Sequence, residues 1–428
     1  MAIMISTEVT GRSGQSTTEL VTDPGDTGDA LSPAAAEPGR RGTRDLRLDM
    51  LRGYALLAMA VDHVGLYASY FHTFSGRGIW IISAAEGFII ISGLTLGTVL
   101  SRESAQAGAA RVVRRTGEVW AGAVGLILGM VLLYLLTGLQ PWYAGEWVAE
   151  EGAWVWLLDV LGLQVEMSGT GILVFYVLVL AAALPAVVML HQRRAWLVVF
   201  VVMAVWLLAQ VRPEAVDLPF ASFRSVAANA PLFLIALVVG FHGRALSAWW
   251  RTRRWARALD VVTVAVAAAL GALHTLGYPG LPWLADRLGG EDPLSIRETT
   301  MPWATLLAVT VVFRAIWLVV TWAWPVVYAT LGRPLAYLGA ASLITFGSDL
   351  LAIQLFWGIP GNPGDVIDSR WLATALIAVY LALMIVPVVA IRSLQRWVRA
   401  AGPRVRRAST FLPVVLIVSF GAGVLALG

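Results

Sequence analysis

The 428-residue chain has no cysteine and no lysine, and only 14% of its residues are charged. The lack of cysteine excludes disulfides, thiolate metal sites and a cysteine nucleophile. All 31 basic residues are therefore arginines. The chain also lacks a phosphate-binding glycine loop, a Gly-x-Ser-x-Gly elbow and a cluster with metal-ligand spacing, so we expect no metal cofactor. With 58% hydrophobic residues, this composition is not that of a soluble protein.

Long apolar runs recur along almost the whole chain. A helix needs about 20 apolar residues to cross a hydrocarbon core of about 30 Å. We therefore predict an all-α integral membrane protein with about ten transmembrane helices. The stretch 411–428 could form an eleventh, whereas 152–164 is too short to cross and fits a re-entrant or interfacial piece. The predicted spans are 48–68, 78–100, 117–138, 171–190, 195–211, 223–242, 259–277, 301–324, 335–357 and 371–391.

The two ends of the chain differ from this apolar body. Residues 1–43 are rich in Ser, Thr, Gly, Pro and Ala and lack apolar periodicity, which predicts a disordered tail. The first residues lack the basic and apolar regions of a signal peptide. We expect the transmembrane domain over 44–391, followed by a basic cytoplasmic segment and the optional last helix over 392–428.

The arginines orient the predicted helices. With the tail placed in the cytoplasm, 22 arginines fall in inner segments and 6 in outer segments. Cytoplasmic loops carry such an excess of basic residues, so we predict a cytoplasmic N-terminus in a multi-pass plasma-membrane protein. The bilayer then accounts for the basic pI of about 9.6 without a nucleic-acid partner. No internal repeat is visible.

Four ionisable residues fall within the first two predicted spans: Arg52, Asp62, His63 and Glu86. Such groups are expensive in a membrane and are functional candidates by default. Arg52 and His63 share one helix face about 16 Å apart, with Arg52 nearer the cytoplasm. Glu86 lies about 12 Å inward from the outer end of its span, at a depth similar to that of His63.

This arrangement suits a transfer across the membrane. A cation at the inner mouth can hold an anionic donor, while an imidazole removes a proton from a hydroxyl arriving from outside. Glu86 is the better partner for His63, because Asp62 is adjacent in sequence and faces another way. Two alternatives stay open: a packing network without chemistry, and a proton-coupled transporter in which Asp62, His63 and Glu86 form a relay.

The stretches RLDMLRGYALLAMAVDH and SAAEGFIIISGLTLG resemble the opening of the OpgC family of membrane acyltransferases. The spacing of Arg52 and His63 is similar to the signature of the related acyltransferase-3 proteins. The resemblance implies a ten-helix bacterial membrane protein that moves an acetyl or succinyl group from cytosolic acyl-CoA to a hydroxyl of an extracytoplasmic glycan. It further implies that His63 is the catalytic base with support from Glu86, and that Arg52 and Arg47 contact the donor phosphates.

Two further arginines are candidates for the donor site. Arg314 interrupts the predicted span 301–324 about 20 Å from its outer end, where it must pair with a carboxylate or line a polar cavity; a CoA phosphate and a structural carboxylate are both open as partners. Arg333 precedes the ninth span, where cytoplasmic placement alone also explains it. Ala341 stands where relatives carry a histidine, which leaves open a non-catalytic scaffold.

Overall fold

A computed structural model describes residues 45–75, 82–138, 153–165, 167, 169–216, 226–276, 301–357, 367 and 369–400. The chain divides after Arg44, and every described residue belongs to the unit that begins at Asp45. The predicted tail and the optional helix at 411–428 lie outside the described residues.

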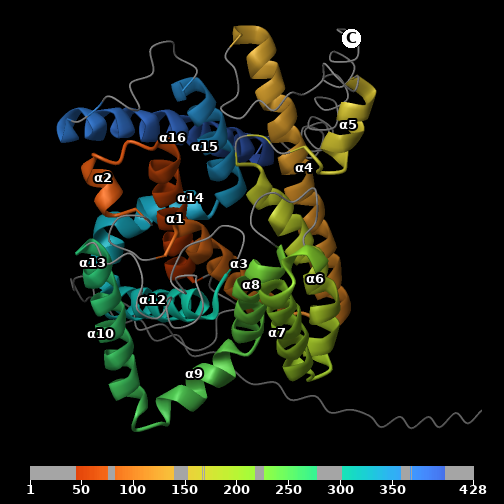
Figure 1. Ribbon diagram of the computed structural model, residues 1–428, viewed down its shortest axis with the longest axis vertical. Coiled ribbons are helices and arrows are strands. Elements are labelled where there is room, and N and C mark those ends of the chain that lie inside the picture. Colours follow the sequence, from red (N-terminus) through yellow and green to blue (C-terminus); the bar gives the residue numbers. More distant parts are fainter. Residues whose placement is uncertain are drawn as a thin grey trace, which may run out of the picture. The chain divides into compact units, whose positions relative to one another are not determined.

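The regular elements of the described residues are all helical, which confirms the predicted all-α class (Figure 1). A 3-10 turn follows α7 at Pro213–Ala215 and a π turn precedes α14 at Tyr328–Gly332. The α-helices are α1 Leu46–Val64, α2 Tyr70–Thr73, α3 Ala84–Leu100, α4 Ala105–Thr137, α5 Ala153–Leu161, α6 Gly171–His191, α7 Ala195–Val211, α8 Val226–Phe241, α9 Gly243–Arg251, α10 Ala256–Thr275, α12 Trp303–Trp322, α13 Trp324–Val327, α14 Arg333–Gly339, α15 Ser342–Trp357 and α16 Arg370–Ala400.

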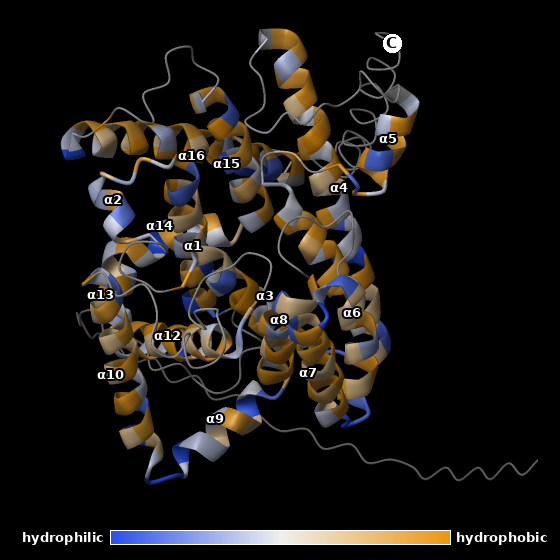
Figure 2. Cartoon of the chain, viewed as in Figure 1, coloured by the Kyte–Doolittle hydropathy of each residue, from blue (hydrophilic) through white to orange (hydrophobic). Residues whose placement is uncertain are grey.

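Nine of the ten predicted spans each coincide with one of these helices, whereas the span 335–357 consists of α14 and α15, and the count of ten is not confirmed as membrane crossings. Five helices are long and apolar enough to cross: α4, α6, α10, α12 and α16. Two bent pairs would bring the number to seven: α8 with α9, bent by 71°, and Trp324–Gly339 with Ser342–Trp357, bent by 86°. Figure 2 shows the hydrophobic residues that dominate the long helices. The chain is thus a multi-pass membrane protein.

The backbones of α1 and α14 touch where two glycines face each other. A Cβ atom at Gly53 would lie 1.9 Å from the carbonyl oxygen of Leu335, and one at Gly339 would lie 1.9 Å from that of Asp49. Only glycine fits at such a crossing. Because α15 follows α14 directly, this crossing also sets where α15 lies relative to α1.

The C-terminal half of α1 packs against α15 and α16. Ala60, Val64, Ile353 and Ile377 are almost completely buried in one apolar cluster with Tyr380. Three helices from the two ends of the chain therefore converge around the last turn of α1, which carries His63.

Candidate active site

His63, in the last turn of α1, meets a carboxylate that comes from α15. Its ring nitrogen Nδ1 lies 2.8 Å from Oδ2 of Asp349. The Asp349 side chain is 2% exposed and the His63 side chain 30% exposed. A buried carboxylate next to Nδ1 stabilises the tautomer with the proton on that nitrogen, so that Nε2 becomes the proton acceptor.

Tyr380 of α16 holds Asp349 from the other side. Its hydroxyl donates to Oδ1 of Asp349 and lies 3.2 Å from the backbone carbonyl oxygen of the same residue. Tyr380 is completely buried. One oxygen of the Asp349 carboxylate thus accepts a hydrogen bond from His63 of α1, and the other accepts one from Tyr380 of α16. These two bonds fix the orientation of the carboxylate and of the imidazole.

Sequence reasoning missed both Asp349 and Tyr380. Asp349 lies inside the predicted span 335–357, so the rule that singled out Asp62 and Glu86 also applies to it. Tyr380 has no such signal, because a tyrosine in an apolar helix is ordinary.

Glu86 contacts its own helix. Its Oε2 accepts a hydrogen bond of 2.7 Å from the backbone N–H of Ser83, and the side chain of Ser83 completes a capping box at the start of α3. Such a box satisfies the free N–H groups of a helix start. Glu86 is fully buried. The carboxylate found at the His63 ring is that of Asp349, whereas the sequence predicted Glu86 at this position.

Asp62 also has a partner other than His63. Its Oδ1 lies 3.6 Å from Nδ1 of His72 in α2, and the Ser75 hydroxyl lies 3.1 Å from the same nitrogen. Asp62 and His63 are neighbours on α1 and point in different directions, as expected for adjacent helical residues. The C-terminal end of α1 thus carries two separate histidine–carboxylate pairs.

Arg52 lies about three helical turns before His63 on α1 and points toward α3. Its Nη2 donates to Oγ1 of Thr95 at 2.9 Å, and its Nη1 lies 3.9 Å from Oδ1 of Asp49. The Arg52 side chain is 11% exposed. Leu56 and Met59, between Arg52 and His63 on α1, are buried.

Arg47 lies at the first turn of α1 and contacts α12. It pairs with Asp45 at 2.7 Å, donates to Thr321 at 3.2 Å and stacks on the Trp317 ring at 4.6 Å. Its side chain is 30% exposed. This guanidinium is thus held in place and still accessible.

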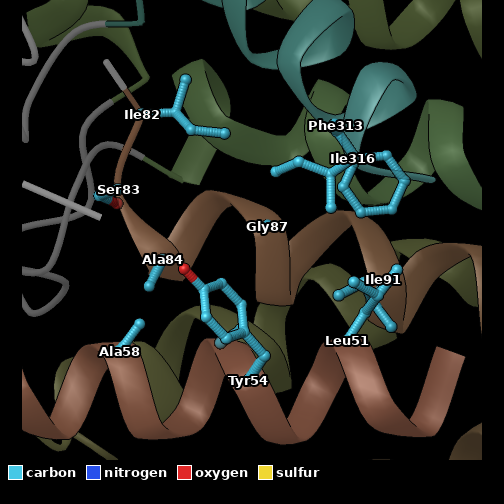
Figure 3. Close-up of a pocket in the computed structure, with 11 residues that line it drawn as sticks. Leu51, Tyr54, Ala58, Ile82, Ser83, Ala84, Gly87, Ile91, Phe313 and Ile316 are labelled. Carbon is cyan, nitrogen blue, oxygen red and sulfur yellow. The ribbon is translucent and has the colours of Figure 1, made fainter. Parts of the chain in front are cut away.

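An apolar pocket lies between α1, α3 and α12 (Figure 3). It encloses about 440 Å³, part of it open to the surroundings. Its lining residues on α1 run from Leu51 to Ala58, which includes the first part of the stretch between Arg52 and His63. Its lining residues are Leu51, Tyr54, Ala55, Ala58, Ile82, Ser83, Ala84, Gly87, Ile91, Phe313 and Ile316.

Comparison with known protein families matches residues 44–396 to the family described as OpgC protein. The chain belongs to the OpgC family. The resemblance seen in the first two helices is thereby confirmed over α1 to α16, and every candidate residue lies within the match. No curated protein and no solved structure matches the chain. As an OpgC protein, the chain is a membrane acyltransferase that acts in glycan modification.

The two remaining donor candidates of this OpgC protein have different surroundings. Arg314 donates to Oδ1 of Asp260 at 2.8 Å and lies over the ring of Trp250 at 5.4 Å, so of its two open partners the structure shows a carboxylate. Arg333 is exposed and stacks on Tyr328 at 5.4 Å. The structure brings neither arginine to Arg52 or His63.

Proposed function

We propose that this OpgC protein transfers an acetyl or succinyl group from cytosolic acyl-CoA to a hydroxyl of a glycan outside the plasma membrane, with His63 as the general base. The observation that carries the proposal is the 2.8 Å contact between Nδ1 of His63 and the buried carboxylate of Asp349. A histidine oriented in this way is suited to proton transfer near neutral pH.

The reaction balances with these groups alone. Nε2 of His63 takes the proton of the acceptor hydroxyl while the hydroxyl oxygen attacks the thioester carbonyl. The carbon–sulfur bond then breaks, and the thiolate of CoA receives the proton from the imidazolium. Asp349 keeps the ring in the productive tautomer and stabilises its charge, and Tyr380 holds Asp349.

The donor fits the cytoplasmic half of α1. Arg47 and Arg52 supply two cations about 8 Å apart along the axis, and guanidinium groups are well suited to phosphates. The apolar pocket beside Leu51 and Ala58 lies along the same half of α1 and is partly open to the surroundings. This order of groups, cations first and base last, supports entry of acyl-CoA from the side at which α1 begins.

The acceptor fits the opposite end of α1, where aromatic side chains are exposed. Tyr67, Phe74 and Trp371 are 56%, 63% and 75% exposed. The ring of Tyr70 lies 5.1 Å from that of Trp371, and the backbone N–H of Tyr70 donates to Thr374 at the start of α16. Aromatic faces of this kind can stack on sugar rings.

The transporter alternative has less support. Its relay would need Asp62, His63 and Glu86 to exchange protons, whereas the three side chains contact His72, Asp349 and Ser83. Membership of the OpgC family also favours acyl transfer.

Mass analysis of the envelope glycans from cells with and without the gene tests the proposal. We expect a mass difference of one acetyl or one succinyl unit, which disappears in cells that carry His63→Ala. His72→Ala is the matched control, because His72 is the second histidine beside a carboxylate at the same end of α1. Glycans that keep the acyl group in His63→Ala cells would refute the role of His63.

A further inference from the structure

Helix α9 has two chemically different faces. Arg244, Ser247 and Arg251 follow each other along one side, and Leu246, Trp249 and Trp250 along the other, at helical spacing. Figure 2 shows this mixture of hydrophilic and hydrophobic residues on α9. The helix also turns away from α8 by 71° (Figure 1). A helix that follows an apolar helix at such an angle lies closer to the plane of a membrane than to its normal.

Within the described residues, both faces of α9 are exposed. Leu246 and Trp249 are 43% and 45% exposed, and Arg244, Ser247 and Arg251 are exposed as well. The main contacts of α9 with described elements are those with α8. A membrane interface accommodates both faces at once, because it offers acyl chains to one side and headgroups to the other.

The helix and the turn after it carry a positive charge that the protein does not neutralise. The stretch 243–260 contains a single acid, Asp260, which is paired with Arg314 at 2.8 Å. Within the described part of the chain, five exposed arginines of this stretch make no ion pair: Arg244, Arg251, Arg253, Arg254 and Arg257.

A cluster of tryptophans lies beside these arginines and contacts one of them, Arg253. The ring of Trp255 lies 5.8 Å from that of Trp249 and 5.4 Å from that of Trp250. The Arg253 guanidinium lies 5.0 Å over Trp249, and Nε1 of Trp250 donates to Asp260 on α10 at 3.3 Å. Tryptophan prefers the level of lipid headgroups, so a tryptophan cluster on α9 and the following turn fits a position at that level, with the arginines of the same stretch close by in sequence.

We propose that α9 and the α9–α10 turn form an anionic-lipid site, in which the five arginines bind phospholipid headgroups and the tryptophans enter the interface. The site is separate from the acyl-transfer residues, because His63, Asp349 and Arg52 lie on other helices. It does not depend on the proposed reaction.

The test uses the full-length protein purified in a neutral detergent. The ligand is dioctanoyl phosphatidylglycerol, the neutral comparison is dioctanoyl phosphatidylcholine, and coenzyme A is added separately as a soluble phosphate. Binding is measured as the rise of the unfolding temperature with ligand concentration, since a ligand stabilises the state it binds. We expect a rise with phosphatidylglycerol and a much smaller one with phosphatidylcholine.

The decisive variant is R251Q/R253Q/R254Q. An arginine near a membrane surface contributes about fivefold in affinity for anionic lipid, so losing three should weaken phosphatidylglycerol binding by about 100-fold. R251K/R253K/R254K keeps the charge and should keep most of the binding. The control R114Q/R193Q/R194Q removes three exposed arginines elsewhere and should bind nearly as tightly as the wild type. The three lysine or glutamine variants should unfold near the wild-type temperature without lipid.

Three results would overturn the proposal. Equal binding of phosphatidylglycerol by the wild type and R251Q/R253Q/R254Q would show that the site lies elsewhere. Equal losses in this variant and in the control would show that any exposed arginines suffice. An arginine-dependent rise with coenzyme A instead of phosphatidylglycerol would show that the surface binds a soluble phosphate.

Discussion

The variant Asp349→Asn tests whether the charge and hydrogen bonding of Asp349, and not only its size, orient the His63 ring. Asparagine has the same shape but no charge, and its amide can present an N–H group to Nδ1 of His63, which favours the wrong tautomer. The contact is 2.8 Å long and the Asp349 side chain is 2% exposed, so water cannot replace the lost acceptor. We therefore expect Asp349→Asn to lower kcat although His63, the proposed base, is still present.

The expected loss follows from this geometry. In serine proteases, the same exchange behind a catalytic histidine lowers kcat by about 10⁴. Here His63 is 30% exposed and can reorient more easily, so we expect a loss of about 10² to 10³ in kcat. This corresponds to about 3–4 kcal/mol of activation free energy. KM for acyl-CoA should change little, because Asp349 lies at the end of α1 opposite Arg47.

The assay measures CoA release with purified protein in nanodiscs and a glycan fraction from cells that lack the gene. Glu86→Gln is the matched control: it also replaces a buried carboxylate by its amide, but the amide oxygen can still accept from the backbone N–H of Ser83. We expect it to keep kcat within about threefold of the wild type. Equal kcat values for Asp349→Asn and the wild type, or a larger loss in Glu86→Gln, would refute Asp349 as the orienting group.

Three further predictions test the surroundings of this site. Arg52→Gln should raise KM for acyl-CoA by about tenfold, because a charge-assisted contact of about 1.5–3 kcal/mol is lost; an unchanged KM in steady-state kinetics would exclude Arg52 from the donor site. Gly339→Ala should lower the free energy of unfolding, followed by thermal unfolding, by about 3 kcal/mol, because the new Cβ would lie 1.9 Å from an α1 carbonyl oxygen. Gly117→Ala, whose Cβ would have no atom within 4 Å, should leave the free energy of unfolding unchanged in the same measurement. Arg111→Gln should lower the free energy of unfolding by about 0.5–1 kcal/mol near pH 7. Hydrogen bonds from Arg111 lower the pKa of Glu103 below its ordinary 4.5, so the ion pair stabilises the folded protein above that pH. The difference in stability between the variant and the wild type should therefore shrink as the pH falls below about 4.

Hydropathy and charge predicted the parts of the fold that depend on local sequence. The ten apolar segments all became helices, because an apolar run of that length satisfies its backbone hydrogen bonds internally. How each helix bends was not predictable in this way. The 86° bend separates α14, which crosses α1, from α15, and this crossing joins residues far apart in the chain.

The candidate site was half predictable for the same reason. Arg52 and His63 share a helix, so their spacing predicted their common face. Partners on other helices need tertiary information: the matched depth of Glu86 suggested contact with His63, but the carboxylate at the ring comes from Asp349. Depth in a membrane is one coordinate, and two helices at equal depth can face different neighbours.

The distance in sequence between His63 and Asp349 has a consequence for biogenesis. The two residues are 286 positions apart, and Tyr380 lies further along still. A nascent chain inserts its helices from the N-terminus onward, so His63 enters the bilayer long before Asp349, which follows only after most of the polypeptide has been synthesised. Incomplete chains would therefore carry a histidine without its orienting partner, and acyl transfer would begin only after assembly is finished.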